Sequence, residues 1–204
     1  MSALLPSLVS CTTHLSPLLC STHLARLLKR LNIYCNDLQI MNSPAVVGRV
    51  ASLHLHPIKP GGALQSVDSI EVVETKGIRG EPRYFGRVKA ETNTPSRRQI
   101  TLIEREQISE HAAALGLSSI APGAVRSNIE SIGIDLIALI GREIEIGKAI
   151  LFLYAHRDPC PKMDAVCQGL RERMLNKCQG VLAEVRRSGE IRVGDTIRVR
   201  EGAE

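Results

Sequence analysis

Beyond its first 40 residues, this chain is a succession of short apolar runs rich in Val, Ile and Leu, most of which end at a glycine or a proline. Short β-branched runs between such breaks are typical of β-strands. Aromatic residues make up only 2% of the chain and Trp is absent, so the core must be built from Ile, Leu, Val and Ala. The pattern predicts a mainly β fold with a few helices, of the α+β class.

The expected strands follow one another closely along the chain. They cover residues 46–54, 69–75, 99–103, 125–129, 134–140, 143–146, 148–155, 182–187, 191–193 and 196–200. The runs 143–146 and 148–155 are predicted to form a hairpin that turns near Gly147. Many short strands with glycine turns predict a single β-barrel-like domain.

Two segments have the spacing of apolar residues that is typical of helices. Residues 104–115 place apolar side chains on one face and stop before Gly116. Residues 164–175 align Leu170 and Met174 in the same way. We therefore predict two helices among the strands.

The first 40 residues differ from the rest. No acidic residue precedes Asp37, Leu, Ser and Thr are frequent, and the cations come late. This resembles a transit peptide more than a secretory signal, although a non-functional extension before a start at Met41 is an alternative. We expect residues 1–40 to be a leader, disordered or a transit peptide, and residues 41–204 to be the folded domain.

Neither the apolar runs nor the net charge indicates a membrane or nucleic-acid protein. No run of about 18 apolar residues occurs, so no transmembrane segment is expected. The net charge is +5, but the first 40 residues hold three cations and one acid, which leaves +3 with both signs interspersed. A nucleic-acid surface would need a concentrated basic patch. We expect an intracellular protein, cytoplasmic or, with a functional transit peptide, mitochondrial, and no nucleic-acid partner.

The six cysteines divide evenly between the leader and the body of the chain. They are Cys11, Cys20 and Cys35 in the leader, and Cys160, Cys167 and Cys178 in the body. No C-x-x-C pair occurs, so a structural zinc site is unsupported. Without a secretory signal, reduced thiols are the simplest expectation.

One of these thiols lies in an unusual setting, Arg157-Asp158-Pro159-Cys160-Pro161-Lys162. Prolines on both sides stiffen the backbone, and the flanking cations favour the thiolate, the form that ligates metals and attacks electrophiles. The alternative is a small apolar residue at the end of a strand.

Two further places are candidate anion sites. In the expected strand 125–129, a period of two puts Arg126 and Asn128 on one face, where a guanidinium and an amide can grip an anion. Lys59 follows the first strand and can point into a phosphate site. The alternatives are an ordinary exposed strand face and a solvated lysine.

Six segments, in this order, resemble the MOSC domain family, found at the C-terminal end of molybdenum cofactor sulfurases and in stand-alone proteins. The resemblance runs from about Val47 to Val199 and is nearer the stand-alone type. The segments are His56-Pro57-Ile58-Lys59, the loop from Gly77 to Gly86 with Arg83, Arg98-Gln99-Ile100-Thr101-Leu102-Ile103, Pro122-Gly123 through Asn128-Ile129, Ile146-Gly147-Lys148-Ala149 with Arg157-x-Pro159-Cys160, and Gly180 through Gly194-Asp195.

The resemblance implies a β-barrel that binds molybdenum cofactor, a pyranopterin with Mo. By analogy with the amidoxime-reducing relatives, Cys160 would be the catalytic residue and the metal ligand. Lys59, Arg83, Arg126 and Asn128 would bind the anionic end of the cofactor. A soft thiolate suits a soft metal centre, and cationic side chains suit a phosphate.

The function that this implies is reduction of small N-hydroxylated compounds, with electrons from an external donor protein. One alternative is a sulfur carrier that holds a persulfide on Cys160 and exchanges sulfur with a sulfurtransferase. Another is a non-catalytic module that only binds the cofactor.

Overall fold

The computed structural model describes residues 47–176 and 178–200. The predicted leader and its three cysteines lie outside these residues. The described elements run, in order, β1 (Val47–Leu55), β2 (Gln65–Val67), β3 (Ser69–Val73), β4 (Gly77–Ile78), β5 (Ile100–Glu104), α2 (Arg105–Ala114), β6 (Ile129–Ile132), β7 (Glu143–Ile146), β8 (Ala149–His156), η1 (Pro161–Met163), α3 (Leu170–Arg173), β9 (Val181–Arg187), β10 (Gly189–Arg192) and β11 (Thr196–Val199).

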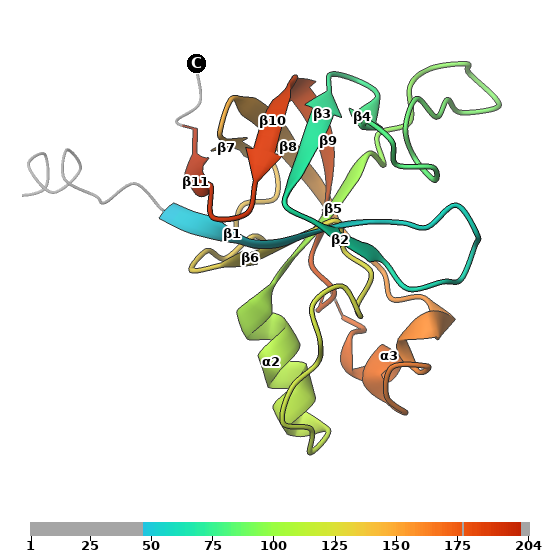
Figure 1. Ribbon diagram of the computed structural model, residues 1–204, viewed down its shortest axis with the longest axis vertical. Coiled ribbons are helices and arrows are strands. Elements are labelled where there is room, and N and C mark those ends of the chain that lie inside the picture. Colours follow the sequence, from blue (N-terminus) through green and yellow to red (C-terminus); the bar gives the residue numbers. More distant parts are fainter. Residues whose placement is uncertain (1–46, 177, 201–204) are drawn as a thin grey trace, which may run out of the picture. The chain divides into compact units, whose positions relative to one another are not determined.

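Seven strands close into a mixed β-barrel, which confirms the predicted fold class (Figure 1). The order around the barrel is β1, β6, β5, β9, β8, β7 and β11, and β11 pairs with β1 to close the ring. All neighbours are antiparallel except β5 and β6, which are parallel. The short strand β2 pairs antiparallel with the C-terminal end of β1. The strands β3, β4 and β10 form a separate small sheet.

The barrel interior is filled by aliphatic side chains, as the lack of aromatic residues requires. In β7, Ile144 and Ile146 are buried while Glu143 and Glu145 are partly exposed, because successive side chains of a strand point to opposite faces. The predicted hairpin is confirmed, since β7 pairs with β8 and Gly147 turns between them with a φ of +58°.

The helices cover one end of the barrel and enclose a second apolar cluster. The predicted first helix is confirmed as α2, and it buries Ile108 and Ala112 against Met163, Leu170 and other residues of this cluster. The predicted helix 164–175 is wrong: only the 3-10 turn η1 and the short α3 form there. Gly169 has a φ of +86°, which no right-handed helix accommodates, and it separates the two.

Two predicted strands are also wrong. Residues 125–129 are not a strand, because Arg126 adopts a φ of +62° and β6 begins only at Ile129. Residues 134–140 form turns, in which the carboxylates of Asp135 and Glu104 accept backbone N–H groups that a strand would have used for pairing.

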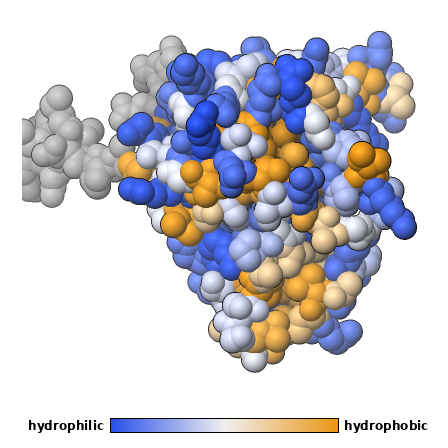
Figure 2. Space-filling model, viewed as in Figure 1, coloured by the Kyte–Doolittle hydropathy of each residue, from blue (hydrophilic) through white to orange (hydrophobic). Residues whose placement is uncertain are grey.

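The exposed surface mixes both kinds of residue. Figure 2 shows apolar residues interrupting the hydrophilic surface over the middle of the molecule and again at its lower end, where the helices lie. Within residues 47–176 and 178–200, no helix has the length and apolar character needed to cross a membrane.

The close approach of Gly180 to β5 gives a test of the barrel's packing. An added Cβ would lie 2.8 Å from the Cβ of Ile103 and would collide with the carbonyl oxygen of Leu102, at a φ of +73°. We expect Gly180→Ala to lower the free energy of unfolding by about 3 kcal/mol or more, because backbone must move as well as adopt a left-handed conformation.

Gly116→Ala is the matched control, since Gly116 has a φ of +71° and no atom within 4 Å of the added Cβ. Its substitution should lower the free energy of unfolding by only about 1 kcal/mol. Urea unfolding of both variants measures the difference, and equal losses would contradict the packing explanation.

Candidate functional site

Four segments that are far apart in the sequence meet at one side of the barrel. They are the loop after β1, the turn after β4, the turn before β6 and the segment between β8 and η1. Together they enclose a hollow of about 130 Å³ lined by His56, Pro57, Ile58, Pro60, Gly61, Pro82, Arg83, Arg126 and Lys162.

The charged residues that line this hollow are all cationic at neutral pH. Arg83, Arg126 and Lys162 belong to three different segments, and no carboxylate is among the lining residues. The Lys162 Nζ lies 3.5 Å from the position that a Cβ on Gly61 would take, so the ammonium reaches across to the loop after β1. Such a rim favours an anion.

Arg126 is held in place by its own backbone and by the loop opposite. Its φ of +62° is uncommon for a residue other than glycine, and its side chain is only 8% exposed. The guanidinium donates a hydrogen bond to the carbonyl oxygen of Gly62 at 2.7 Å. A strained backbone and a fixed side chain are features that cluster at functional sites.

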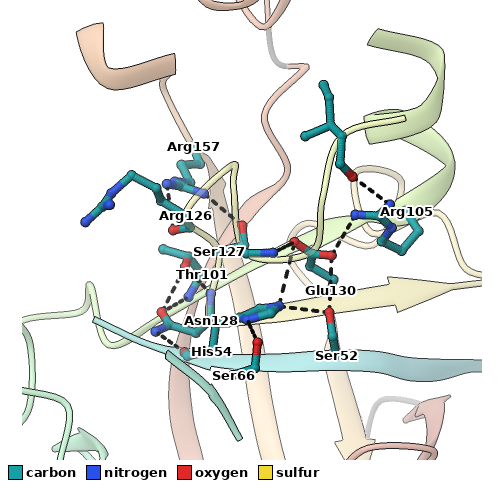
Figure 3. Close-up of polar contacts among 12 residues, drawn as sticks. Ser52, His54, Ser66, Thr101, Arg105, Arg126, Ser127, Asn128, Glu130 and Arg157 are labelled. Carbon is teal, nitrogen blue, oxygen red and sulfur yellow. Dashed lines mark hydrogen bonds and ion pairs between the residues drawn. The ribbon is translucent and has the colours of Figure 1, made fainter. Parts of the chain in front are cut away.

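Beside Arg126 lies a second arginine, Arg157, which is 5% exposed (Figure 3). Its guanidinium donates to the Ser127 hydroxyl at 2.8 Å and to the Arg126 carbonyl oxygen at 3.0 Å, and its Nε has no partner in the part of the chain that the structure describes. No carboxylate among the described residues forms an ion pair with it. A buried cation without a counterion is costly, and it is a signature of a site that receives an anion.

The ionisation of Arg157 reflects this setting. Burial is the main cause that lowers its pKa to about 10, with the charge of Arg98 acting in the same direction and Cys160 opposing it. The guanidinium therefore stays protonated at neutral pH, within the electrostatic range of the Cys160 sulfur.

Cys160 ends the segment that Arg157 begins. Its backbone is extended, with φ −97° and ψ 161°. Its carbonyl oxygen accepts a hydrogen bond from the N–H of Met163, and this bond closes the turn of η1. The side chain is half-buried and the thiol is free. Cys160 is not among the residues that line the hollow, and it packs in part against the second apolar cluster. Its link to the hollow is Lys162, which belongs to the 3-10 turn that begins after Cys160 and lines the hollow.

The buried carboxylate of Glu81 holds together the segments that carry His56 and Arg83, which line the small hollow. The Glu81 carboxylate accepts hydrogen bonds from the His56 backbone N–H, the Arg83 backbone N–H and the Asn128 amide. Burial acts to raise the pKa of Glu81, but the hydrogen bonds from His56 and Arg83 outweigh it, so the pKa is lowered. Arg83 and Arg98 then stack against the ring of Tyr84, with the guanidinium carbons 5.5 and 5.3 Å from its centroid.

A buried polar network supports the turn that carries Arg126 (Figure 3). The Glu130 carboxylate accepts the Gly123 N–H at 2.8 Å and pairs with Arg105 at 3.0 Å. His54, fully buried, lies within hydrogen-bonding distance of Ser52 at 2.9 Å and of Ser66 at 3.3 Å. This network fixes the turn at Gly123, three residues before Arg126.

A larger and mostly apolar hollow of about 470 Å³ adjoins the first. It is lined by Gly61, Gly62, Ala63, Leu64, Ala121, Pro122, Gly123, Ala124, Arg126, Lys162, Ala165 and Val166. Because Gly61, Arg126 and Lys162 line both hollows, a ligand with an anionic end and an apolar body can occupy the two together.

Comparison with known proteins agrees with this architecture. The family model of the MOSC domain matches residues 75–198. The chain belongs to the MOSC domain family. No curated protein matches this MOSC protein at a significant level.

Solved structures share its fold. The YuaD protein of Bacillus subtilis is 21% identical, with a TM-score of 0.62 over 77% of this chain and 97% of that chain. YiiM of Geobacillus stearothermophilus is 17% identical, with a TM-score of 0.56 over 76% of this chain and 75% of that chain. YiiM of Escherichia coli is also 17% identical, with a TM-score of 0.53 over 78% and 70% of the two chains. At this identity the likeness shows the fold alone.

Within this MOSC fold, the candidate residues are not all equally placed. Arg83 and Arg126 both line the small hollow. Lys59 is exposed and does not line it, although its neighbours in the sequence, Ile58 and Pro60, do. Asn128 is fully buried, and its amide oxygen and nitrogen already bond to Thr101 and Glu81. Direct contact of Lys59 or Asn128 with a cofactor stays a prediction.

The sequence analysis identified Arg157 and Lys162 as the cations that flank Cys160, but it did not assign either of them to the anion site. The recurrence of a cation on each side of a proline-bounded thiol is the signal that could have suggested this role. Among the described residues, no group of three or more His, Cys, Asp or Glu side chains is arranged to hold a metal ion.

Arg157 gives the sharpest test of anion binding. We expect inorganic phosphate to raise the Tm of the MOSC protein by about 3 °C or more near saturation. The rise should disappear in Arg157→Met, which removes the buried cation, and persist in Arg200→Met, which breaks only a surface pair with Glu143. Thermal melts at constant ionic strength measure this, and an unchanged phosphate response in Arg157→Met would refute the role of this cation.

His54 predicts a pH dependence of stability. Burial is the main cause that lowers the pKa of His54, with the Arg105 charge adding to it and Glu130 opposing it. Unfolded chains bind a proton below about pH 6.5 that the folded state resists, so stability falls on acidification below that pH. His54→Gln should flatten the pH slope by up to about 1.4 kcal/mol per pH unit. Urea unfolding from pH 7.5 to 5.5 measures it, and an unaltered slope contradicts the assignment.

Proposed function

We propose that this MOSC protein binds molybdenum cofactor and reduces small N-hydroxylated compounds with electrons from an external donor protein. The single observation that carries the proposal is the Arg157 guanidinium, which is buried, forms no ion pair with a carboxylate of the described residues, and lies within electrostatic range of the free thiol of Cys160. A cofactor with a phosphate end and a sulfur-binding metal matches both features in chemistry.

The shapes of the two hollows support this assignment. The smaller one has the three cations and the size for a phosphate group, and the larger one offers apolar walls for the rest of a cofactor or its substrate. Arg83 and Lys162 would hold the phosphate oxygens, and Arg126 would direct them from the wall that both hollows share. Arg157, which is bonded to the Arg126 carbonyl oxygen, would add to the positive potential of the site.

The thiolate of Cys160 would be the protein's ligand to molybdenum. Because the described residues form no cluster of metal-binding side chains, the remaining donors must come with the cofactor itself. When bound, the molybdenum centre would supply the two-electron redox chemistry, and the protein positions and shields it. Reduction of a hydroxylamine to an amine consumes two electrons and two protons and releases water, so the donor protein is an obligatory partner.

A sulfur carrier is the second candidate. A half-buried free thiol in the field of a buried guanidinium also suits an anionic persulfide. A partner sulfurtransferase would pass the sulfane sulfur of its own persulfide to the Cys160 thiolate and be left as a thiolate. Cys160 would then pass this sulfur to an acceptor and return to the thiolate. The larger hollow favours the cofactor-binding reading, because a carrier of a single sulfur atom needs no such space.

Elemental analysis of protein from a host that makes the cofactor tests the proposal. We expect about one molybdenum atom per chain in the wild type, and close to none in Cys160→Ala, because the variant lacks the soft ligand. Cys178→Ala is the matched control, since Cys178 is also a free, half-buried thiol but lies in the wall of a different pocket, and it should keep its molybdenum.

The outcomes separate the candidates. Molybdenum with turnover of a hydroxylamine supports the reductase, and molybdenum without turnover supports a binding module. Cyanide-releasable sulfur that Cys160→Ala abolishes, without molybdenum, would favour the carrier. Equal molybdenum in wild type and Cys160→Ala would overturn the role of Cys160 as ligand.

A further inference from the structure

A separate cavity lies between α2 and the turns that follow β6. It has a volume of about 510 Å³ and is lined by Glu104, Glu106, Gln107, Glu110, Gly133, Ile134, Asp135 and Ile137. It shares no lining residue with either hollow of the candidate site. Whatever it binds is therefore recognised independently of the proposed cofactor.

The charged residues that line this cavity are all carboxylates. Glu104 ends β5, Glu106 and Glu110 are one helical turn apart on α2, and Asp135 lies in the facing turn. Like charges at this helical spacing repel each other. Among the described residues, none of these four carboxylates forms an ion pair.

Two residues that line this cavity each have a buried oxygen atom without a hydrogen-bond partner among the described residues. Glu104 is only 7% exposed; its Oε1 accepts the Leu136 N–H at 2.6 Å, and its Oε2 is the first of these atoms. The second is the amide oxygen of Gln107, in the first turn of α2. Native proteins rarely leave buried acceptors unsatisfied, so these two atoms point to a missing donor.

The pKa of Glu104 is raised, as expected for a buried carboxylate without a cation beside it. Burial is the main cause that raises the pKa of Glu104, and the charge of Asp135 adds to this, although the backbone N–H groups of Glu104 itself, Leu136 and Ile137 oppose it. A positively charged ligand would reverse this tendency by favouring the ionised carboxylate.

An organic cation suits these acceptors. No group of three or more His, Cys, Asp or Glu side chains among the described residues is arranged to hold a metal ion. A primary ammonium supplies three donors from one atom and can serve several separated acceptors. The side chains of Ile134 and Ile137 provide an apolar wall for the alkyl chain behind it.

We infer that this cavity binds a primary alkylammonium group, which inserts its charge toward Glu104 and Gln107 and lays its alkyl chain along Ile134 and Ile137. The group can belong to a free aliphatic diamine or to a lysine side chain of a partner protein. Glu106, Glu110 and Asp135 contribute attraction at the rim.

Calorimetric titration of the full chain tests this with three probes: 1,4-diaminobutane, Nα-acetyl-lysine amide and the uncharged 1,4-butanediol. We expect saturable binding of at least one amine and none of the diol. Glu104→Gln should weaken binding about tenfold or more, because the shape is kept while the buried charge is lost. Glu91→Gln, which removes an exposed carboxylate outside the cavity, is the control and should bind like the wild type.

A second variant guards against loss of folding in Glu104→Gln. Glu110→Gln changes an exposed position of α2, so circular dichroism should be unaltered and binding should weaken by a smaller factor. Preference for the diamine identifies a small-molecule ligand, and preference for the lysine amide identifies a partner protein. Absence of saturable amine binding to folded wild type, or equal affinity of wild type and Glu104→Gln, overturns the inference.

Discussion

The contact on which the candidate site depends is the pair of hydrogen bonds from Arg157 to the Ser127 hydroxyl and the Arg126 carbonyl oxygen. These bonds join the segment that carries Cys160 to the turn that carries Arg126. A buried guanidinium without a carboxylate partner opposes folding, so a well-packed apolar residue would stabilise the protein better. Together with the left-handed backbone of Arg126, it marks a place where the fold keeps an unfavourable arrangement that an anion would relieve.

The rest of the molecule makes that arrangement rigid. The parallel pair β5 and β6 places Thr101 beside Asn128, and the Asn128 amide then reaches the Glu81 carboxylate on the far wall. Glu130, in β6, accepts the backbone N–H of Gly123 and so holds that turn in place. Asn128, Glu81 and Glu130 thereby hold the backbone segments that carry Arg83 and Arg126. Replacing one of these buried polar residues would therefore shift the cations of the hollow, although none of the three lines it.

Sequence patterns predicted the parts of this fold in which local preference and tertiary structure agree. The alternation in β7 and β8 and the turn at Gly147 sufficed for the hairpin, and the apolar spacing of α2 sufficed for the helix. The patterns failed where long-range contacts decide. The period of two over 125–129 is coincidental, because this segment packs all its residues inward around the turn at Arg126. Arg83 and Arg126 were predictable from the family resemblance, but the burial of Arg157 depends on Ser127, thirty positions away.

The two charged regions are kept apart by a single strand. In β5, Thr101 faces the network behind the cationic hollow, and Glu104 lines the acidic cavity, because residues three apart in a strand point to opposite faces. The rise between Thr101 and Glu104 along the strand is about 10 Å. Salt screens buried charges much less than exposed ones, so a cation bound at Glu104 and an anion bound at Arg126 would attract each other across the barrel. The barrel can hold ligands of opposite charge at once, because the two openings share no lining residue.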